Sequence, residues 1–292
     1  MVMYIGIDHG TTAIRFACET GHFKISREDA REFKFRDLER LCPVDKIDGI
    51  SVCYSMGDGI SAITSIGKVK NRGVVSREGA GEHIGGGTKV YDEVAGSGVP
   101  AVVIPGIHRG SPTDPRFKAY SHQTSPEKIG IAYQVFLDHG GDFVVADVSS
   151  NTVTMLVSGG NIVGAFDACI FSPGMKHGAL DVDAIRKIDN GEWSANEAFL
   201  HAGVGESLPA EVRKSALAMF TAMECASMKL LKRDAKVALA GSMAPAIAAE
   251  VEDLLQEKVF VYDEWCASTG LWKIAKEVFE RKEGVLGLEL DL

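Results

Sequence analysis

A short pattern that occurs twice is the feature of this 292-residue sequence that most constrains its fold. In each copy an apolar segment ends on an aspartate, a small polar turn follows, and two more apolar segments come after it. When the copies are aligned, Asp8 falls on Asp147, Thr11 on Ser150 and Gly21 on Gly160. The apolar segments are residues 4–8, 13–18 and 22–26 in the first copy, and 143–147, 153–157 and 161–165 in the second. Two in-register copies of one strand–turn–strand–turn–strand unit predict two domains with the same core.

Helical patterns follow each copy. The best-marked helix lies between them, since Ser125 suits an N-cap and Pro126 the first helical position. Helices are expected at about 125–139, 209–233 and 266–281 and after Pro245, with further short strands near 237–240 and 259–262. Strands followed by helices, given twice, predict an α/β protein with mixed sheets. The Gly-rich residues 68–98 predict a long mobile loop, and the apolar ending, 285–292, predicts a docked tail or a subunit contact.

Composition excludes several classes of function. A formal net charge of −9 argues against a general nucleic-acid binder, because such surfaces are usually basic. The six cysteines form no C-x-x-C pair, so neither a zinc ribbon nor a thioredoxin motif is supported. The start of the chain lacks the pattern of a signal peptide, and no apolar stretch reaches the roughly 18 residues of a membrane span. We therefore expect a reduced, cytoplasmic protein without a membrane partner.

The two Asp-ended turns carry groups that suit a polyphosphate. Gly10 lets backbone N–H groups approach oxygen atoms closely, and Thr11 and Thr12 add hydroxyl donors. Asp8 can hold Mg²⁺ through water, because this ion prefers few carboxylates and keeps part of its hydration shell. The second copy supplies the corresponding residues Asp147, Ser149, Ser150, Asn151 and Thr152. No P-loop signature is present, so a nucleotide would bind in another way.

Three segments, in order, resemble the first phosphate, second phosphate and adenosine motifs of the actin, Hsp70 and sugar-kinase superfamily. They are IGIDHGTT at 5–12, VADVSSNT at 145–152 and VALAGSMAP at 237–245. Residues 127–137 and 268–275 resemble the two connecting helices of that superfamily. The likeness spans nearly the whole chain. It implies two RNase-H-like, actin-like ATPase domains with mixed five-stranded sheets around a nucleotide cleft. The domains would be 1–139 and 140–292, with a last helix from 270–292 packing on the first.

Two further segments, 119–133 and 159–181, resemble the acetate and butyrate kinase branch. The stretches 6–17 and 171–189 are most similar to methanogenesis marker protein 12, which implies a methanogenic archaeal setting and carries no reaction. The sequence departs from the acyl kinases in its first motif, Asp8-His-Gly-Thr-Thr12, and in Ser149-Ser150-Asn151 of the second. Nucleotide binding coupled to hydrolysis or regulation therefore stays open beside kinase chemistry.

The resemblance assigns roles to individual residues. Adenine would lie near Gly241, Ser242 and Met243, and Gly270 would also contact the nucleotide. Asp8 and Asp147 would hold Mg²⁺ and act in catalysis. Glu127 is either a third catalytic carboxylate, near the metal or the attacking water, or an acid favoured by the helix dipole. The residues that would meet the acceptor substrate are Asp58, His122, Asp167, Ser172 and His177.

The sequence thus predicts an ATP–Mg²⁺-binding phosphotransferase that acts on a small acid or another metabolite. The alternative is a nucleotide-dependent switch or assembly factor that acts on a partner protein with slow or no turnover. Neither hypothesis identifies the molecule that would accept the phosphate, and both are compatible with a homodimer.

Overall fold

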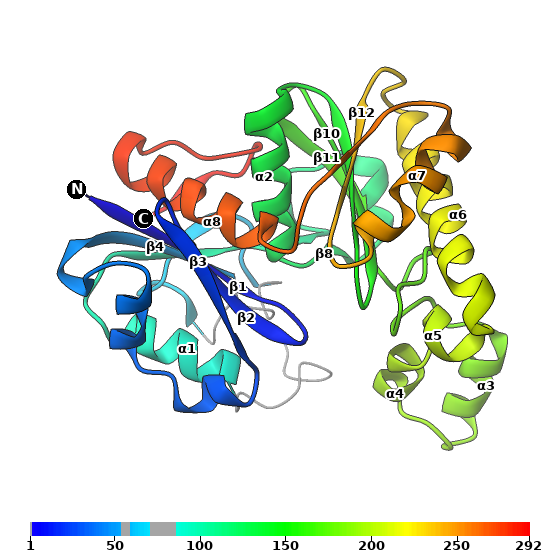
Figure 1. Ribbon diagram of the computed structural model, residues 1–292, viewed down its shortest axis with the longest axis horizontal. Coiled ribbons are helices and arrows are strands. Elements are labelled where there is room, and N and C mark those ends of the chain that lie inside the picture. The colour runs from blue at the N-terminus through cyan, green and yellow to red at the C-terminus, as the bar shows by residue number, and fades with distance from the viewer. Residues whose placement is uncertain (1, 54–58, 71–85) are drawn as a thin grey trace. The chain divides into compact units, whose positions relative to one another are not determined.

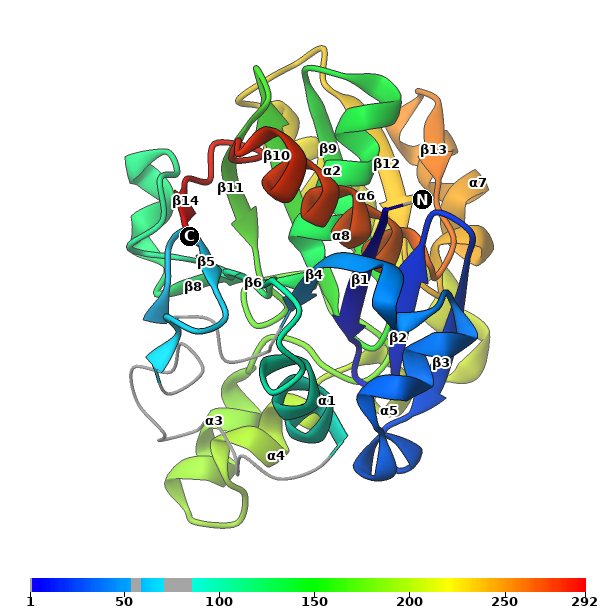
Figure 2. The same cartoon turned by 90° about the vertical axis from the view of Figure 1, so that its left-hand side faces the viewer.

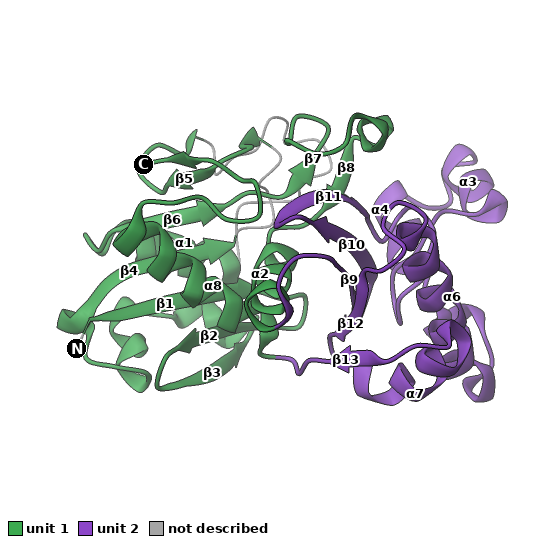
Figure 3. Ribbon diagram, turned by 90° about the horizontal axis from the view of Figure 1, so that it is seen from above, with its two compact units in different colours: residues 1–138, 265–292 green, residues 139–264 purple. Residues whose placement is uncertain are grey.

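The computed structural model describes residues 2–53, 59–70 and 86–292 (Figure 1). The chain forms two compact units (Figure 3). Unit 1 comprises Met1–Asp138 and Trp265–Leu292, and unit 2 comprises His139–Glu264. Each unit is built on a mixed β-sheet with helices, so the predicted α/β class is confirmed.

The sheet of unit 1 has the strand order β14-β5-β6-β4-β1-β2-β3. Its strands are β1 (Met3–His9), β2 (Ala13–Cys18), β3 (Gly21–Ser26), β4 (Ile47–Cys53), β5 (Ile63–Ser65), β6 (Ala101–Ile104) and β14 (Leu290–Asp291). β2 runs antiparallel to both β1 and β3, whereas β4 lies parallel to both β1 and β6. All seven residues of β1 are buried, because this central strand is covered on both faces.

The sheet of unit 1 is larger than the expected five strands, since β5 and β14 extend it beyond β6. β5 pairs antiparallel with β6, and β14 pairs parallel with β5 through Leu290 and Ile63. An ion pair of 2.6 Å between Lys68 Nζ and Asp291 Oδ1 also links the C-terminal end of the chain to the segment that follows β5. The apolar ending therefore docks within its own unit, as one of the two sequence alternatives predicted.

Helices α2 (Glu127–His139) and α8 (Cys266–Lys276) pack together in unit 1 (Figure 2). α8 lies on β1, β2 and β4, and it continues as a π-helical turn, η7 (Glu277–Arg281). A third helix, α1 (Gly86–Ala95), falls inside the segment predicted as a loop. That prediction was wrong for this part: Val90, Tyr91 and Val94 give α1 an apolar face that packs in the core despite the glycines at its start. A two-stranded sheet, β7 (Ile107–His108) with β8 (His122–Thr124), precedes α2.

Unit 2 has the expected five-stranded sheet, in the order β11-β10-β9-β12-β13. Its strands are β9 (Phe143–Val148), β10 (Thr152–Ser158), β11 (Asn161–Phe166), β12 (Lys236–Ala240) and β13 (Val259–Val261). Its helices are α3 (Val182–Asp189), α4 (Ala195–Leu200), α5 (Val204–Ser207), α6 (Ala210–Lys229) and α7 (Ala244–Leu255). α6 packs against β9, β10 and α7. Within the described parts of both units, no helix combines the length and apolar character that crossing a bilayer requires.

Candidate functional site

The first Asp-ended turn joins β1 to β2 in unit 1. Asp8 is only 4% exposed, whereas Thr11 and Thr12 at the tip of the turn are exposed. A side chain at Gly10 would collide with the Arg15 guanidinium and with the carbonyl oxygen of Ala13. The turn therefore presents hydroxyl groups to solvent beside a buried carboxylate and requires glycine where it folds back.

Arg15 is the partner of Asp8 that sequence reasoning missed. The two residues face each other in the β1–β2 ladder, and Arg15 Nη1 lies 3.6 Å from Asp8 Oδ2. Both side chains are largely buried, with exposed fractions of 15% for Arg15 and 6% for Asp8, so each group balances the charge of the other and holds it in place. The signal in the sequence is an arginine inside an otherwise apolar strand, which needs an acid across the hairpin.

Cys53 and His9 are further described neighbours of Asp8. Cys53, at the end of β4, donates to the Ile7 carbonyl oxygen at 3.4 Å, and its Sγ lies 3.9 Å from Asp8 Oδ1. Burial, then the negative charges of Asp8 and Glu127, raise the pKa of the Cys53 thiol, so it stays protonated. Burial, then the charge of Arg27, lowers the pKa of His9 to about 3, so the imidazole is neutral at physiological pH.

Glu127 is the first residue of α2, in unit 1. Its negative charge, like that of Asp8, raises the pKa of the Cys53 thiol. Lys128 Nζ lies 3.0 Å from Glu127 Oε1, and Ser125 Oγ donates to the same oxygen at 2.6 Å. Burial raises the pKa of Glu127, but Lys128 and Ser125 outweigh it and lower the pKa below its ordinary value. Glu127 is therefore an ionised carboxylate whose charge is balanced by a buried lysine, a partner the sequence analysis did not identify.

The second Asp-ended turn and the predicted adenosine motif meet within unit 2. Ser149 Oγ donates to Asp147 Oδ1 at 3.2 Å and accepts from the Ser242 backbone N–H at 3.1 Å. The Met243 N–H donates to the Val148 carbonyl oxygen at 2.9 Å. Gly241 has a φ of +92°, and a side chain there would collide with both Asp147 and Ser149. Two segments about 90 residues apart in sequence thus form one assembly around the Asp147 carboxylate.

A third segment, residues 174–177, fastens the other side of this turn. The backbone N–H groups of Met175 and Lys176 donate to the Ser149 and Ser150 carbonyl oxygens at 3.0 and 2.8 Å. Gly174 contacts the backbone of Asn151 so closely that no side chain would fit. Thr152 Oγ1, which is buried, donates to the Pro173 carbonyl oxygen at 2.8 Å. The turn is therefore held rigidly, with the Ser149, Ser150 and Asn151 side chains only partly buried.

The same segment connects the turn to the small helices of unit 2. Gly203 N–H donates to the Lys176 carbonyl oxygen at 2.9 Å, and Gly205 N–H donates to that of Met175 at 2.9 Å. His177 is buried, with its ring stacked on Phe199 of α4 at 4.9 Å between centroids. Burial, then the charge of Lys176, lowers the pKa of His177. Displacement of the turn would thus be passed to helices α4 and α5.

Asp167 and Ser172 lie near a buried acid, Glu224 of α6. Glu224 is 1% exposed; it accepts from Thr154 Oγ1 at 2.7 Å and from the Ser172 N–H at 2.9 Å. Burial raises its pKa to about 7, the two hydrogen bonds oppose the shift, and the charge of Asp167 adds to it. Glu224 could not be recognised as a buried acid from the sequence, because an acid within an amphipathic helix is normally solvent-exposed.

Glu224→Gln should make the protein more stable at pH 8 by about 3 kcal/mol and at pH 5 by less than about 1 kcal/mol. The unfolded carboxyl loses its proton near pH 4.5 and the folded one near pH 7, so stability falls as pH rises through this window. Glutamine keeps both hydrogen bonds, since the Thr154 hydroxyl can accept instead of donate. Urea unfolding at both pH values measures the effect, with Glu211→Gln on the exposed side of α6 as the control. An equal change at both pH values would contradict it.

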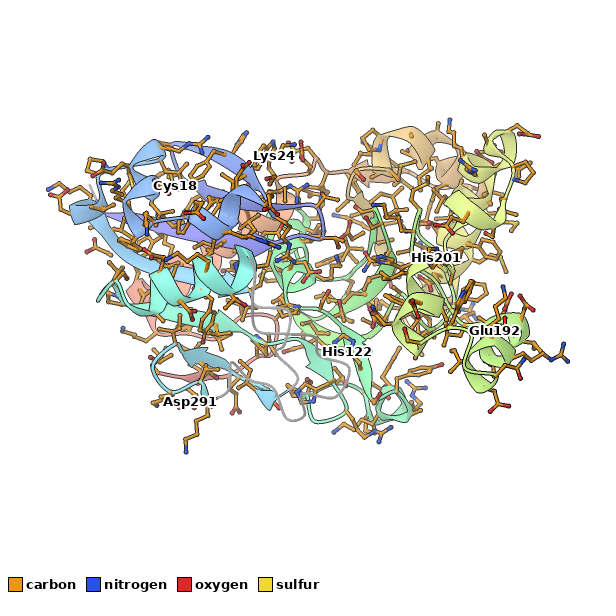
Figure 4. The ribbon with its side chains drawn as sticks, turned by 90° about the horizontal axis from the view of Figure 1, so that it is seen from below. Cys18, Lys24, His122, Glu192, His201 and Asp291 are labelled. Atoms are coloured by element: carbon orange, nitrogen blue, oxygen red, sulfur yellow. The ribbon has the colours of Figure 1, made fainter. Side chains whose placement is uncertain are left out.

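The three other predicted site residues are Asp58, His122 and Gly270. Asp58 lies outside the described residues. His122 lies in β8 of unit 1 (Figure 4), where it pairs with His108. Gly270 is buried inside α8, and a side chain there would collide with the Gly130 backbone of α2. This helix contact is enough to explain the glycine, and the nucleotide-binding role of Gly270 stays a prediction.

Each Asp-ended turn, taken by itself, offers a ligand that fits Mg²⁺. Asp8 in unit 1 and Asp147 in unit 2 each lie one residue before the end of a strand and are largely buried, and carboxylate oxygens are ligands that this ion prefers. The neighbouring hydroxyl groups of Thr11, Thr12 and Ser149 are suited to bind phosphate or ordered water. Across residues 2–53, 59–70 and 86–292, no cluster of three or more His, Cys, Asp or Glu side chains is arranged for a metal ion. Mg²⁺ needs no such cluster, because it keeps several waters and binds through one or two carboxylates.

Comparisons with solved structures identify the fold. The chain is similar to a propionate kinase from Francisella tularensis, with a TM-score of 0.57, 13% identity and coverage of 94% of this chain and 100% of that one. It is also similar to a ROK family glucokinase from Streptomyces griseus, solved with glucose and AMPPNP (TM-score 0.51, 12% identity, 94% and 99% coverage). The fold is thus the two-domain fold of sugar and acetate kinases, and the predicted fold class is confirmed.

Sequence relatives give the family. No family model matches the chain. A UPF0285 protein from Methanosarcina mazei is 41% identical over 321 aligned residues, with 99% of each chain covered. Another, from Methanocaldococcus jannaschii, is 42% identical over 323 residues, with 98% of each chain covered. Because both relatives are more than 40% identical to the chain over nearly its whole length, the chain belongs to the UPF0285 family of methanogen proteins.

Proposed function

We propose that this protein binds ATP with Mg²⁺ and transfers the γ-phosphate to a small carboxylate or another small metabolite. The observation that carries the proposal is the assembly of Asp147, Ser149, Gly241 and Ser242 in unit 2. It joins the predicted second phosphate segment to the predicted adenosine segment through two hydrogen bonds, from the Ser242 N–H to Ser149 Oγ at 3.1 Å and from the Met243 N–H to the Val148 carbonyl oxygen at 2.9 Å. The kinase-type fold supports the same reading.

The proposed roles follow from the chemistry of each group. Asp8 and Asp147 would hold Mg²⁺, whose charge stabilises the phosphoryl group during transfer. The Thr11, Thr12 and Ser149 hydroxyls would donate to phosphate oxygens, and Gly241, Ser242 and Met243 would lie against the adenosine. Arg15 would hold the Asp8 carboxylate in one orientation. Glu127 stays ionised, so it would orient the acceptor or a water rather than donate a proton. Asp167, Ser172, His177, His122 and Asp58 remain candidates for acceptor contact.

A nucleotide-dependent switch is the second candidate, and one observation favours it. Residues 174–177 join the Ser149–Ser150 turn to Gly203 and Gly205 at the start of α5, so a ligand on the turn would reposition the helices beyond it. Incubation with ATP–Mg²⁺ and a panel of small acids and sugars separates the two candidates. A phosphorylated product supports the kinase; tight binding with negligible turnover supports the switch.

Gly241→Ala should weaken ATP binding by about tenfold or more, because the added methyl group displaces Asp147 and Ser149. The control is Gly191→Ala, also in unit 2. Gly191 has a φ of +73°, and a side chain there meets nothing within 4 Å. Both variants carry the same kind of backbone strain, so only the displacement of Asp147 and Ser149 distinguishes them. Equal affinities of the two variants, measured by calorimetry, would count against the nucleotide-binding role of this assembly.

A further inference from the structure

Helix α6 of unit 2 is apolar on the face that it turns to solvent as well as on the face that it buries. Its inner face, including Leu217, Cys225 and Met228, packs against β9, β10 and α7. Its outer face has an apolar residue at alternating intervals of four and three positions, and the last of these residues caps the helix. They are Val212, Ala216, Met219, Met223, Ala226 and Leu230. We call these six residues the α6 stripe. The exposed fractions of Val212, Met219, Met223 and Leu230 are 39%, 42%, 49% and 80%.

The spacing and composition of the α6 stripe are those of a helix that packs against another helix. Alternating intervals of three and four residues place side chains in one seam, as the a and d positions of a coiled coil do. From Ser215 to Met228 the only charged residue is Glu224, which is buried. A solvated helix face normally carries charges, and a helix that is apolar all round is normally buried. Among residues 2–53, 59–70 and 86–292, the α6 stripe therefore has no packing partner that covers it.

The order of residues in the stripe indicates what covers it. Around Thr221 the stripe has the same pattern of large and small residues in both directions: Val212 matches Leu230, Ala216 matches Ala226, and Met219 matches Met223. Two antiparallel copies related by a two-fold axis at Thr221 would put large side chains against large ones and alanine against alanine. Such a self-complementary patch is what an isologous dimer requires.

The mirrored order of the α6 stripe favours the antiparallel arrangement over the parallel one. Parallel copies would pair each residue with its own counterpart whatever the order, so only an antiparallel contact makes use of the matching pattern. The contact would be about 30 Å long, the length of a 20-residue helix. Phe171, which is 41% exposed and packs edge-to-face on Phe220 of α6 at 5.7 Å, would widen it towards the area that stable dimers bury.

We infer that the α6 stripe is a homodimer interface in which two copies of α6 pack antiparallel about Thr221. This inference is independent of nucleotide binding. It assigns the subunit contact to α6 and not to the C-terminal tail, which is already paired within unit 1 as β14.

Charge substitutions in the stripe test both the interface and its direction. Met219→Glu alone and Met223→Lys alone should each weaken the dimer by about 100-fold, because each buries an unpaired charge against a methionine. The double variant Met219→Glu/Met223→Lys should dimerise again, since the carboxylate introduced in each copy would face the ammonium group introduced in the other. In a parallel dimer the same double variant would bring like charges together and would stay dissociated.

Sedimentation equilibrium of the full chain over a range of concentrations measures these constants, with Ile185→Lys on α3 as the control. Ile185 is 54% exposed and lies outside the stripe, so its substitution should leave the dimer unchanged. All substituted positions are exposed, and circular dichroism verifies that each variant folds. A wild-type chain that stays monomeric well above micromolar concentration would overturn the inference. So would a double variant as dissociated as the single ones.

Discussion

Asp8→Asn should reduce ATP turnover by on the order of 100- to 1,000-fold, the range found when one preorganised electrostatic contact to a transition state is removed. Asparagine keeps the shape of the side chain at the end of β1, and it removes the negative charge that would hold Mg²⁺. Arg15, 3.6 Å away, then has no Asp8 carboxylate to balance it and would repel the metal. The loss therefore has two causes that act in the same direction.

If the protein binds ATP without turnover, the same substitution has a different readout. Mg²⁺ should then strengthen ATP binding to the wild-type chain and have little effect on Asp8→Asn. Asp45→Asn is the control, because the Asp45 side chain is 73% exposed and pairs only at the surface, with Lys46. Thermal unfolding establishes that both variants fold. An Asp8→Asn protein that turned over ATP, and responded to Mg²⁺, as the wild type does would remove the role proposed for this acid.

Gly270→Ala should destabilise unit 1 by about 3 kcal/mol or more, although alanine normally stabilises a helix relative to glycine by about 1 kcal/mol. The sign reverses because the methyl group would overlap the Gly130 backbone of α2. α8 is also pressed against β1, since a side chain at Gly6 would collide with the Ser268 carbonyl oxygen and the Trp272 nitrogen. Helix α8 is thus held by backbone atoms on two sides and has no room to shift.

Urea unfolding measures this effect, with Gly21→Ala as the matched control in unit 1. Gly21 begins β3, and a side chain there meets nothing within 4 Å, so its substitution should change stability by less than about 0.5 kcal/mol. If the two variants unfold at the same urea concentration, the proposed packing role of Gly270 is wrong. In that case the nucleotide-binding role that the sequence predicts would be the better explanation of this glycine.

The sequence predicts those parts of the fold whose pattern is long and periodic. The hairpins of β1–β3 and β9–β11 follow from apolar segments ended by acids and glycines, and α2 follows from its N-cap and spacing. β5 and β14 contain three and two residues, too few to show a period, so the sequence could not indicate a seven-stranded sheet. Helix α1 was hidden by the glycines at its start, which favour a loop until tertiary packing overrides them.

The candidate site shows the same division. Asp8, Asp147 and Gly241 stand out in sequence because they sit where apolar strands stop. The contacts that hold them depend on register and on long-range pairing, which a single sequence does not contain. Arg15 faces Asp8 only because of the β1–β2 register, and Ser149 reaches Ser242 only because β9 and β12 are neighbours. Glu224 could be recognised only once α6 was known to bury that face.

Calorimetric titration of the full chain with ATP, in the presence and absence of Mg²⁺, tests the central claim most directly. We expect saturable 1:1 binding that is strengthened by Mg²⁺, is weakened in Gly241→Ala and is retained in Gly191→Ala. A wild-type chain that binds neither ATP nor another nucleoside triphosphate with Mg²⁺ would contradict the claim.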